Sequence, residues 1–227
     1  MGEVELMSQQ LVISSNIITY GTAATDVLTE QIRDEIETMW NEARGTILIN
    51  EERWEVVFRI TAQCMPAITE LEVLQNVVPR NNYFRIEEFV QGSISFVDGL
   101  GCNSGYFLLE NLYKGSTTAA HEYGHTLGLD HPQNMDIRGQ GAPGIMYPRG
   151  TLVDAQYQYD PSISAGLKGG TMHPMYRRVR EEDIQGLKLQ RLRFDGRKAT
   201  LGEFTNIYHW NHAEGNAELL SFPPLLG

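Results

Sequence analysis

The 227-residue sequence has no long apolar run and little positive charge. No stretch approaches the roughly 20 consecutive apolar residues that a membrane-spanning helix needs, so we expect no membrane partner. Lysine and arginine number 18 against 29 acidic residues, and the formal net charge is −11. Nucleic-acid binding needs a concentrated basic surface. The one basic cluster, Arg177, Arg178 and Arg180, is more typical of a solvated helix start, so we expect no nucleic-acid partner.

Cysteine is also scarce, with Cys64 and Cys102 alone. The pair could close one disulfide, as an exported protein would tend to do. Two unpaired, mostly buried thiols are equally consistent with the sequence, because such thiols occur in any compartment. The first five residues lack the positive and apolar regions of a signal peptide, so no signal peptide is visible and the sequence does not reveal the localisation of the protein.

What remains is the composition of an ordinary globular domain, with 41% hydrophobic and 21% charged residues. Residues 66–80 favour extended structure with loops, residues 132–176 are too rich in proline and glycine for regular structure, and residues 203–227 show no period. We expect one domain made of an N-terminal subdomain, 1–131, and a C-terminal subdomain, 132–227. Apolar periodicity predicts strands at 11–20, 54–62, 83–90, 93–97 and 105–110, and helices at 24–43, 116–129 and 179–192.

The segment 121–131 reads HEYGHTLGLDH and contains a metal-binding pattern. His121 and His125 are four residues apart in a predicted helix, so their rings lie on one face and can reach a single ion. Gly128 lets the chain leave the helix sharply with a positive φ, so that His131 can return to the same ion. A chance match at all five fixed positions is on the order of 1 in 100,000. We therefore predict a metal site at these three histidines.

Zinc is the metal that this set of donors favours. It accepts neutral imidazole, tolerates tetrahedral geometry and leaves a fourth position for a water molecule, whose pKa it lowers to about 7. Glu122 follows the first histidine and projects beside the ion, where it can take a proton from that water. The sequence thus predicts one catalytic Zn²⁺ ion and Glu122 as the general base of a hydrolase.

With these residues the sequence resembles the metzincins, a clan of zinc metallopeptidases named for a methionine turn beneath the metal. Residues 144–148, GIMYP, are similar to that turn in matrixin catalytic domains of the M10 type. The resemblance implies that Met146 is the apolar floor under the three rings and that Tyr147 and Pro148 line the substrate pocket. It also implies an α+β fold: a twisted, mostly parallel sheet, two long helices above the cleft, and an irregular C-terminal subdomain with one helix.

Several features depart from the matrixin pattern and leave the family within the clan open. No histidine precedes His121, so we predict that the structural zinc site of matrixins is missing. No cysteine-switch propeptide is visible, and the insertion 150–178 is longer than a compact matrixin needs. Residues 101–105 are faintly similar to astacins, but Pro132 follows His131 where an acidic residue would be expected. The resemblance favours a secreted or exported protein.

Other polar residues give weaker signals. His209 and His212 form an HxxH pair that could bind a second metal, although no further ligand accompanies them. His173 could lie at the surface or face the cleft. Tyr157 and Tyr159, like Tyr147, could stabilise an oxyanion. Four aspartates in loops rich in glycine or proline could bind Ca²⁺ through oxygen ligands, although no spaced acidic motif is present: Asp98, Asp136, Asp154 and Asp160.

Together these features predict a monomeric zinc-dependent endopeptidase. A peptide or protein substrate would lie extended across the cleft and pair with an edge strand near 93–110. An apolar wall at residues 147–151 would favour a hydrophobic side chain after the scissile bond. Two alternatives share the motif, a zinc hydrolase of a non-peptide amide and a catalytically silent zinc-bearing binding module. The presence of Glu122 argues against the second alternative.

Overall fold

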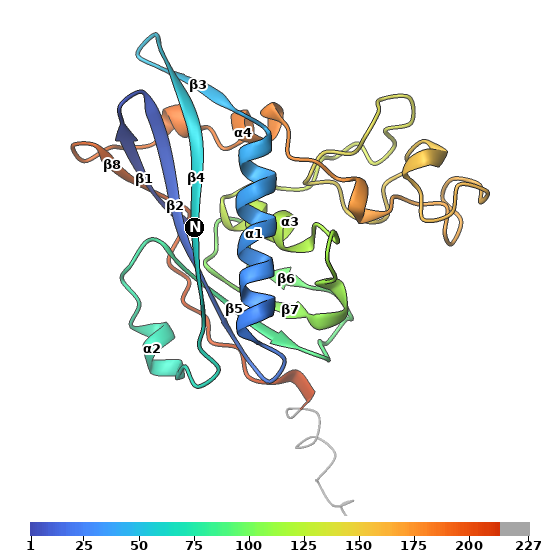
Figure 1. Cartoon of the computed structure of the whole chain (residues 1–227), viewed down its shortest axis with the longest axis horizontal. Coiled ribbons are helices and arrows are strands. Elements are labelled where there is room, and N and C mark those ends of the chain that lie inside the picture. Colours follow the sequence, from blue (N-terminus) through green and yellow to red (C-terminus); the bar gives the residue numbers. More distant parts are fainter. Residues whose placement is uncertain (214–227) are drawn as a thin grey trace, which may run out of the picture.

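Eight strands form one twisted sheet in the computed structural model, which describes residues 1–213 (Figure 1). Within that range no helix combines the length and the apolar character that crossing a membrane requires. The strands are β1 Gly2–Met7, β2 Gln10–Tyr20, β3 Thr46–Ile49, β4 Glu52–Cys64, β5 Asn81–Glu87, β6 Phe96–Val97, β7 Ser104–Leu108 and β8 Lys198–Leu201. The α-helices are α1 Asp26–Glu42, α2 Glu70–Leu74, α3 Thr118–Thr126 and α4 Glu181–Gly186.

The centre of the sheet is parallel and its margins are antiparallel. Strands β4, β2, β5 and β7 lie side by side in parallel register. β3, β6, β1 and β8 each join by antiparallel pairing. The central strand β2 pairs with β4 along one edge, and with β1 and then β5 along the other. The predicted α+β class with a mostly parallel sheet is confirmed.

Strand β2 is buried on both faces, which explains its nearly continuous apolar sequence. Its side chains alternate between two apolar clusters. Ile13 and Ile17 face the main core, which also contains the buried stripes of α1 and α3. Ile18 and Tyr20 face a smaller cluster that includes Val73 of α2. Helices α1 and α3 therefore cover one face of the sheet, and α2 lies on the other face (Figure 1).

Helix α1 packs against α3, the helix that carries His121 and His125. The side chain of Thr25 accepts a hydrogen bond from the backbone N–H of Leu28 and so caps the start of α1. Trp40, fully buried near the end of α1, packs against Phe58 of β4 at a ring separation of 5.2 Å. The indole N–H of Trp40 donates to the backbone oxygen of Ala120 in α3 at 3.1 Å. The amphipathic pattern of residues 24–43 thus predicts this helix correctly, and Ile32 and Ile36 of its apolar stripe are buried, whereas Val27 at its start is 82% exposed.

The C-terminal helix is shorter than the sequence predicts. The apolar stripe predicts a helix over 179–192, but α4 covers only Glu181–Gly186. Lys188 has a positive φ of 52°, which breaks the helical hydrogen-bond ladder before a 3₁₀ turn at Leu189–Arg191. Ile184, Leu187 and Leu189 are buried on both sides of the break, so the apolar period continues where the helix does not.

Three strands and one helix escape the sequence prediction. β1, β3 and β8 were not predicted, and α2 lies in the segment 66–80 that favoured extended structure. Thr69 and Glu72 form a capping box at the start of α2, a signal strong enough to nucleate this short helix. β8 pairs with β1, so the sheet includes residues from both sides of residue 131. Of the tail 203–227, residues 214–227 lie outside the described part of the chain.

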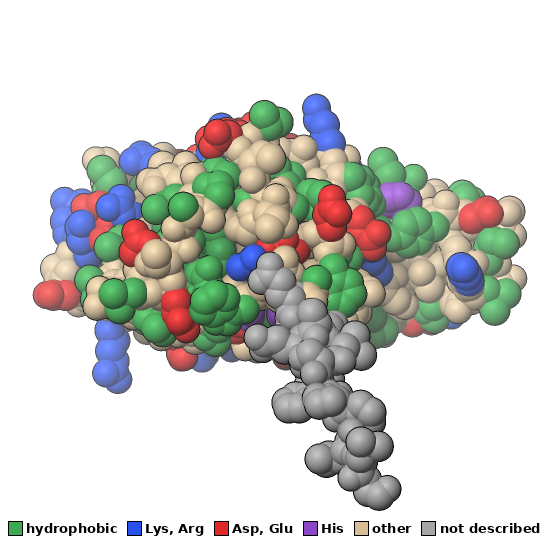
Figure 2. Space-filling model, turned by 90° about the horizontal axis from the view of Figure 1, so that it is seen from below, with side chains coloured by type: hydrophobic (Ala, Val, Ile, Leu, Met, Phe, Trp, Pro, Cys, Tyr) green, Lys and Arg blue, Asp and Glu red, His purple; other side chains and the backbone are tan. Residues whose placement is uncertain are grey.

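Residues 132–176 form loops and 3₁₀ turns that project to one side of the sheet, as their proline and glycine content predicts (Figure 1). A small apolar cluster of Ile137, Val153 and Met172 holds this lobe together. The face in Figure 2 shows acidic, basic and apolar side chains interspersed across the molecule. Cys64 and Cys102 are free thiols, which resolves the choice that the sequence leaves open.

Candidate metal centre

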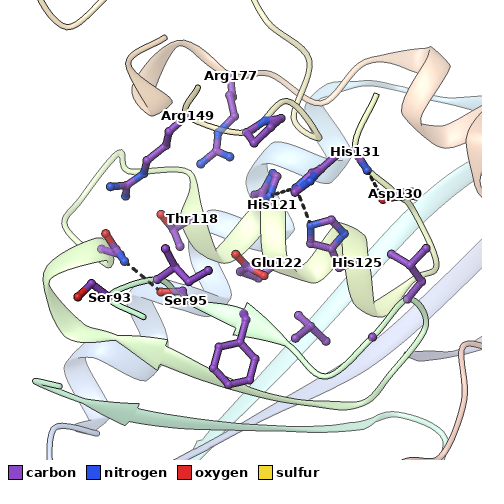
Figure 3. A pocket seen from close by; sticks show the side chains of 17 residues that line it. Ser93, Ser95, Thr118, His121, Glu122, His125, Asp130, His131, Arg149 and Arg177 are labelled. Carbon is purple, nitrogen blue, oxygen red and sulfur yellow. Dashed lines mark hydrogen bonds between the residues drawn. The ribbon is translucent and has the colours of Figure 1, made fainter. Parts of the chain in front are cut away.

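Three histidine rings converge at the C-terminal half of α3 and the loop that follows it (Figure 3). Nε2 of His131 lies 3.1 Å from Nε2 of His121 and 3.1 Å from Nε2 of His125. Two imidazoles that bind zinc tetrahedrally at about 2.0–2.1 Å have their nitrogens about 3.3 Å apart. Within residues 1–213 these three side chains form the one group of ligand atoms close enough to hold a metal ion.

Backbone carbonyls fix the orientation of the two helical rings. Nδ1 of His121 lies 2.7 Å from the oxygen of Ile145, and Nδ1 of His125 lies 2.7 Å from the oxygen of Leu129. A carbonyl oxygen can only accept, so each Nδ1 carries the hydrogen and donates it. Each Nε2 therefore keeps a free lone pair directed at the common point, which is the tautomer that a metal ligand needs.

Burial keeps the three imidazoles neutral. Desolvation lowers the pKa of His121 well below its ordinary value, and the positive charge of Arg177 adds to this effect. Desolvation also lowers the pKa of His125 and of His131, although Asp130 opposes the shift at both rings. Because only neutral imidazole binds a metal, lower pKa values extend the pH range in which the site can be loaded.

Gly128 produces the turn that returns the chain to His131. The backbone N–H of Gly128 donates to the oxygen of His125, and that of Leu129 donates to the oxygen of Gly124, which closes the end of the helix. Gly128 has a φ of 97°, the positive value that the sequence predicts. A Cβ at this position would meet nothing within 4 Å, so glycine is required here by the backbone conformation alone.

Glu122 lies beside the three rings and points into the pocket (Figure 3). Its side chain is buried, and no residue in the range 1–213 forms a hydrogen bond or an ion pair with its carboxylate. Desolvation raises the pKa of Glu122 to about 8, and the charges of Arg177 and Arg149 act in the opposite direction. An unpaired carboxyl with a pKa near neutrality is suited to accept and return a proton.

The turn 144–148 lies against the metal-site helix. The oxygen of Ile145 accepts the His121 hydrogen bond described above. Met146 is buried against Gly124, where a Cβ would lie 2.4 Å from the sulfur of Met146 and 3.2 Å from the ring of Trp40. Gly124 is therefore required by the close approach of the turn, a constraint that HExxHxxGxxH does not record.

Asp183 of α4 supports the same turn from the other side. Its carboxylate accepts a hydrogen bond from the backbone N–H of Arg180 at 2.8 Å. The carboxylate also lies beside the turn, 3.9 Å from the place that a Cβ on Gly144 would take. Desolvation is the main cause that raises the pKa of Asp183 to about 6. Asp183 thus places the start of α4 against the turn beside the three histidines.

A pocket of about 440 Å³ opens in front of the histidines. Pro148 lines it, but the Tyr147 side chain does not and instead packs against the apolar cluster of the lobe. Arg149 and Arg177 line the pocket where the sequence predicts an apolar wall (Figure 3). Arg177 is buried, so the prediction of a solvated arginine cluster is wrong for this residue. Its position depends on chain folding between 131 and 177, which periodicity does not reveal.

The remaining candidate ligands serve other contacts. His209 lies 2.9 Å from the carboxylate of Asp98, and the ring of His212 stacks on Tyr106 at 4.0 Å. The two therefore do not form a metal pair. Nδ1 of His173 accepts a hydrogen bond from the backbone of Met175, away from the pocket. Neither Tyr157 nor Tyr159 lines the pocket. The four aspartates proposed for calcium do not gather into a metal-binding group within the described residues: Asp98, Asp136, Asp154 and Asp160.

Solved structures similar to this chain include archaemetzincin and myroilysin, both at low similarity. No protein-family model matches the sequence, and no curated protein matches it. Archaemetzincin from Methanopyrus kandleri is similar in structure, with a TM-score of 0.38 and 12% identity over 78% of this chain and 95% of that chain. Myroilysin is similar with a TM-score of 0.36 and 14% identity over 85% of this chain and 100% of that chain. At values this low, nothing about the activity of this chain follows from either similarity.

Proposed function

We propose that this chain is a zinc-dependent endopeptidase of the metzincin type, with Zn²⁺ held by His121, His125 and His131 and with Glu122 as general base. The observation that carries the proposal is the convergence of three Nε2 atoms beside a buried carboxylate that no described residue pairs. A structural zinc site is closed by four protein ligands, whereas a catalytic site has three and an open position. The three-histidine set and the adjacent base match the catalytic arrangement.

The residues present fit zinc in three respects. The separations of 3.1 Å between Nε2 atoms are close to those of imidazoles in a tetrahedral zinc site. Two of the three tautomers are fixed by carbonyl acceptors, as is usual for metal-binding histidines. All three rings have lowered pKa values and are neutral at pH 7. Nothing in the described residues supports calcium, and we do not propose it.

Zinc, when bound, would act as a Lewis acid toward the scissile carbonyl and would make water a stronger acid. The protein then supplies the proton transfers. The carboxylate of Glu122, directed into the pocket beside the rings, takes a proton from the attacking water and delivers it to the leaving amine (Figure 3). Its burial favours this role because a desolvated carboxylate binds a proton more readily than an exposed one.

The edge of the sheet beside the pocket can hold a peptide in extended form. β6 is the last strand of the sheet and lines the pocket through Phe96 and Val97. Its outer backbone groups have no strand partner within residues 1–213, so a substrate backbone can add to this edge. Ile94 and Leu100 flank β6 and are exposed, which gives apolar contacts on each side. A peptide is therefore the substrate that this cleft suits best.

The turn at Met146 supports the metzincin type, and its Met-Tyr-Pro sequence supports a matrixin-like placement within that clan. Met146 contacts the zinc helix at Gly124, which is the position that a floor beneath the three rings would occupy. Gly128 would serve the site by placing His131. We also propose that the subdomains 1–131 and 132–227 meet at the cleft, since residues 93–131 line the pocket on one side and Pro148, Arg149 and Arg177 line it on the other.

The proposal is tested by metal content and proteolysis measured on the same preparations. We expect one equivalent of zinc in the wild type and in Glu122→Ala, and chelator-sensitive cleavage of a denatured protein by the wild type alone. Glu122→Ala should lose at least about 100-fold in kcat/KM, the usual contribution of a general base. His173→Ala, a histidine outside the pocket, is the matched control and should keep both properties. Zinc binding without cleavage of any peptide would reject the peptidase and favour the non-peptide amide or the silent module.

A further inference from the structure

Two arginines face the part of the pocket that lies beyond Glu122. Figure 3 shows the guanidinium groups of Arg149 and Arg177 on the same side of the metal site, with Thr118 between them and Glu122. The sequence predicts an apolar wall at 147–151 and a hydrophobic substrate side chain. That prediction does not fit the charges seen in the pocket.

Arg177 carries a buried positive charge that no carboxylate among residues 1–213 contacts directly. Its exposed fraction is 3%. It donates to the hydroxyl of Thr117 at 2.8 Å, to the oxygen of Tyr147 at 3.3 Å and to the oxygen of Ser116 at 3.4 Å. All three acceptors are neutral, and a guanidinium has five N–H donors. Burial accordingly lowers the pKa of Arg177 to about 10, which shows that its charge is poorly compensated.

Arg149 and the hydroxyl of Thr118 are two further hydrogen-bond donors in the pocket, and neither has a partner among residues 1–213. Arg149 is exposed at the pocket wall and forms no ion pair or hydrogen bond with any residue from 1 to 213. Thr118 is 5% exposed, yet its hydroxyl has no partner in the same range. Thr118 lies four residues before Glu122 in α3, so both side chains point from the same face of the helix into the pocket. A buried unpaired hydroxyl is costly unless a ligand satisfies it.

The charged residues that line the pocket balance, whereas the chain as a whole has an excess of acidic residues. The acidic lining residues are Glu122 and Asp130, and the basic ones are Arg149 and Arg177. A bound divalent cation would make the sum positive, whereas the chain as a whole has a formal net charge of −11. A positive pocket in an acidic protein concentrates anionic groups at this one place.

We infer that the substrate presents a carboxylate to this pocket, where Arg149 binds it with help from the Thr118 hydroxyl and from the charge of Arg177. This inference rests on the proposed peptidase function and names its substrate class. A guanidinium binds a carboxylate through two parallel hydrogen bonds, so Arg149 is the residue that contacts substrate. Arg177 acts as a positioning residue, because its bonds to Tyr147 and Ser116 tie the pocket wall to the start of α3. In peptides the carboxylate comes from an acidic side chain or from a free C-terminus.

The test compares peptides that differ only in this carboxylate. A peptide library digested by the zinc-loaded wild type gives a cleaved sequence, from which two matched pairs are synthesised. The two peptides of the first pair carry aspartate or asparagine at the position next to the scissile bond that enters this pocket, and both have an amidated C-terminus. The other pair is neutral and ends at that position with a free carboxylate or an amide. We measure kcat/KM with the wild type and binding, by fluorescence anisotropy, with zinc-loaded Glu122→Gln.

The acidic member of one pair should be favoured about 10- to 100-fold, the usual range for a charge-assisted hydrogen bond, and that pair identifies the source of the carboxylate. Arg149→Gln should bring the ratio close to one. Thr118→Val, which keeps the shape of the side chain, should lower it severalfold. Arg59→Gln removes the same charge from the exposed face of β4 and should leave the ratio unchanged.

Ratios near one for both pairs, or ratios that Arg149→Gln does not change, would overturn the inference. Because the preference is a ratio, it does not depend on the total activity of each variant. If the wild type cleaves no peptide, the pairs are built on a sequence that zinc-loaded Glu122→Gln selects from the same library by binding, and preferential binding of the acidic members would uphold the carboxylate site and reject the peptidase. Equal cleavage of all four peptides would do the reverse.

Discussion

The carboxylate of Glu35 in α1 accepts a hydrogen bond from the backbone N–H of Ala120, the residue before His121, at 3.2 Å. The first turn of α3 needs such an acceptor, because Thr117 at its N-cap has a positive φ and forms no capping bond with its side chain. Glu35 also interacts with the N–H groups of Thr117 and Ala119. One helix therefore caps the helix that carries the candidate metal ligands.

Removal of this cap should destabilise the protein. We expect Glu35→Ala to lower the free energy of unfolding by about 1–2 kcal/mol, the range for a lost helix cap. Glu35→Gln keeps an acceptor oxygen and should cost less. Glu30→Ala on the same helix removes an exposed salt bridge with Arg33 and should cost at most about 0.5 kcal/mol. Urea denaturation of the metal-free proteins measures all three, and equal losses for Glu35→Ala and Glu30→Ala would reject the cap.

Zinc should stabilise the fold through His131. At a free zinc concentration 100 times the Kd, binding to the native state adds about 2.7 kcal/mol, or roughly 5–10 °C in Tm for a chain of this size. His131→Ala should lose most of this shift, since two ligands remain from the three that converge. His173→Ala should keep the full shift. Differential scanning fluorimetry with and without a chelator provides the measurement, and an undiminished shift in His131→Ala would exclude this residue as a ligand.

Gly124 should be intolerant of any side chain. A Cβ at this position would lie 2.4 Å from the Met146 sulfur, and Met146 is buried, so its side chain cannot easily move away. We expect Gly124→Ala to cost about 1–3 kcal/mol despite the better helix propensity of alanine. Gly150→Ala, where a Cβ meets nothing within 4 Å, should be close to neutral.

The contact itself is tested by the double variant Gly124→Ala/Met146→Ala. Met146→Ala should cost about 2–5 kcal/mol as a cavity in the core. If overlap with Met146 causes the cost of Gly124→Ala, the double variant should lose less stability than the two single variants together. Strict additivity would assign the cost to another neighbour such as Trp40.

Asp183 should make stability depend on pH. Its pKa is about 6 in the folded protein and 3.8 in the unfolded chain, so the native state binds more protons between these values. The free energy of unfolding should therefore fall as pH rises from about 4 to about 6, and then level off. Asp183→Asn keeps an acceptor for the Arg180 amide and removes the titrating carboxyl.

The difference in unfolding free energy, wild type minus Asp183→Asn, isolates this carboxyl from all other groups. Between pH 4 and pH 7 it should decrease by about 1–2 kcal/mol, less than the full value for two pKa units because the group is partly solvated. Urea denaturation across this range in a chelating buffer gives the curve. A flat difference, or a rise with pH, would show that burial does not penalise the Asp183 charge.

The convergence of the three histidines was predictable because it is encoded locally. Histidines four apart in a helix must share a face, and the backbone of Gly128 allows the turn that brings in His131. The segment 121–131 is therefore enough to predict both the positive φ of Gly128 and the convergence of the three rings. The mostly parallel sheet was expected only from the resemblance to metzincins, whereas the β-branched and apolar residues of 11–20 predicted the central strand β2 itself.

What the sequence does not reveal depends on long-range packing. Glu35 contacts Ala120 of α3 across 85 residues of sequence, and Arg177 contacts Thr117 across 60 residues. Asp183 lies next to the turn 144–148 and reaches the histidines only through that turn. Nothing in the local pattern around Arg177 distinguishes it from its exposed neighbour Arg178. β8 likewise has too few residues for periodicity to separate it from a loop, and its pairing with β1 decides its structure.

The pairing of β8 with β1 also has a consequence for synthesis of the chain. Residues 198–201 complete an edge of the sheet that begins with residues 2–5. A ribosome must release nearly all of the described chain before this edge can close, whereas the three histidines emerge much earlier. Until then one edge of β1 is unpaired, so β1 joins the other edge strands as a position where self-association can start if translation stalls.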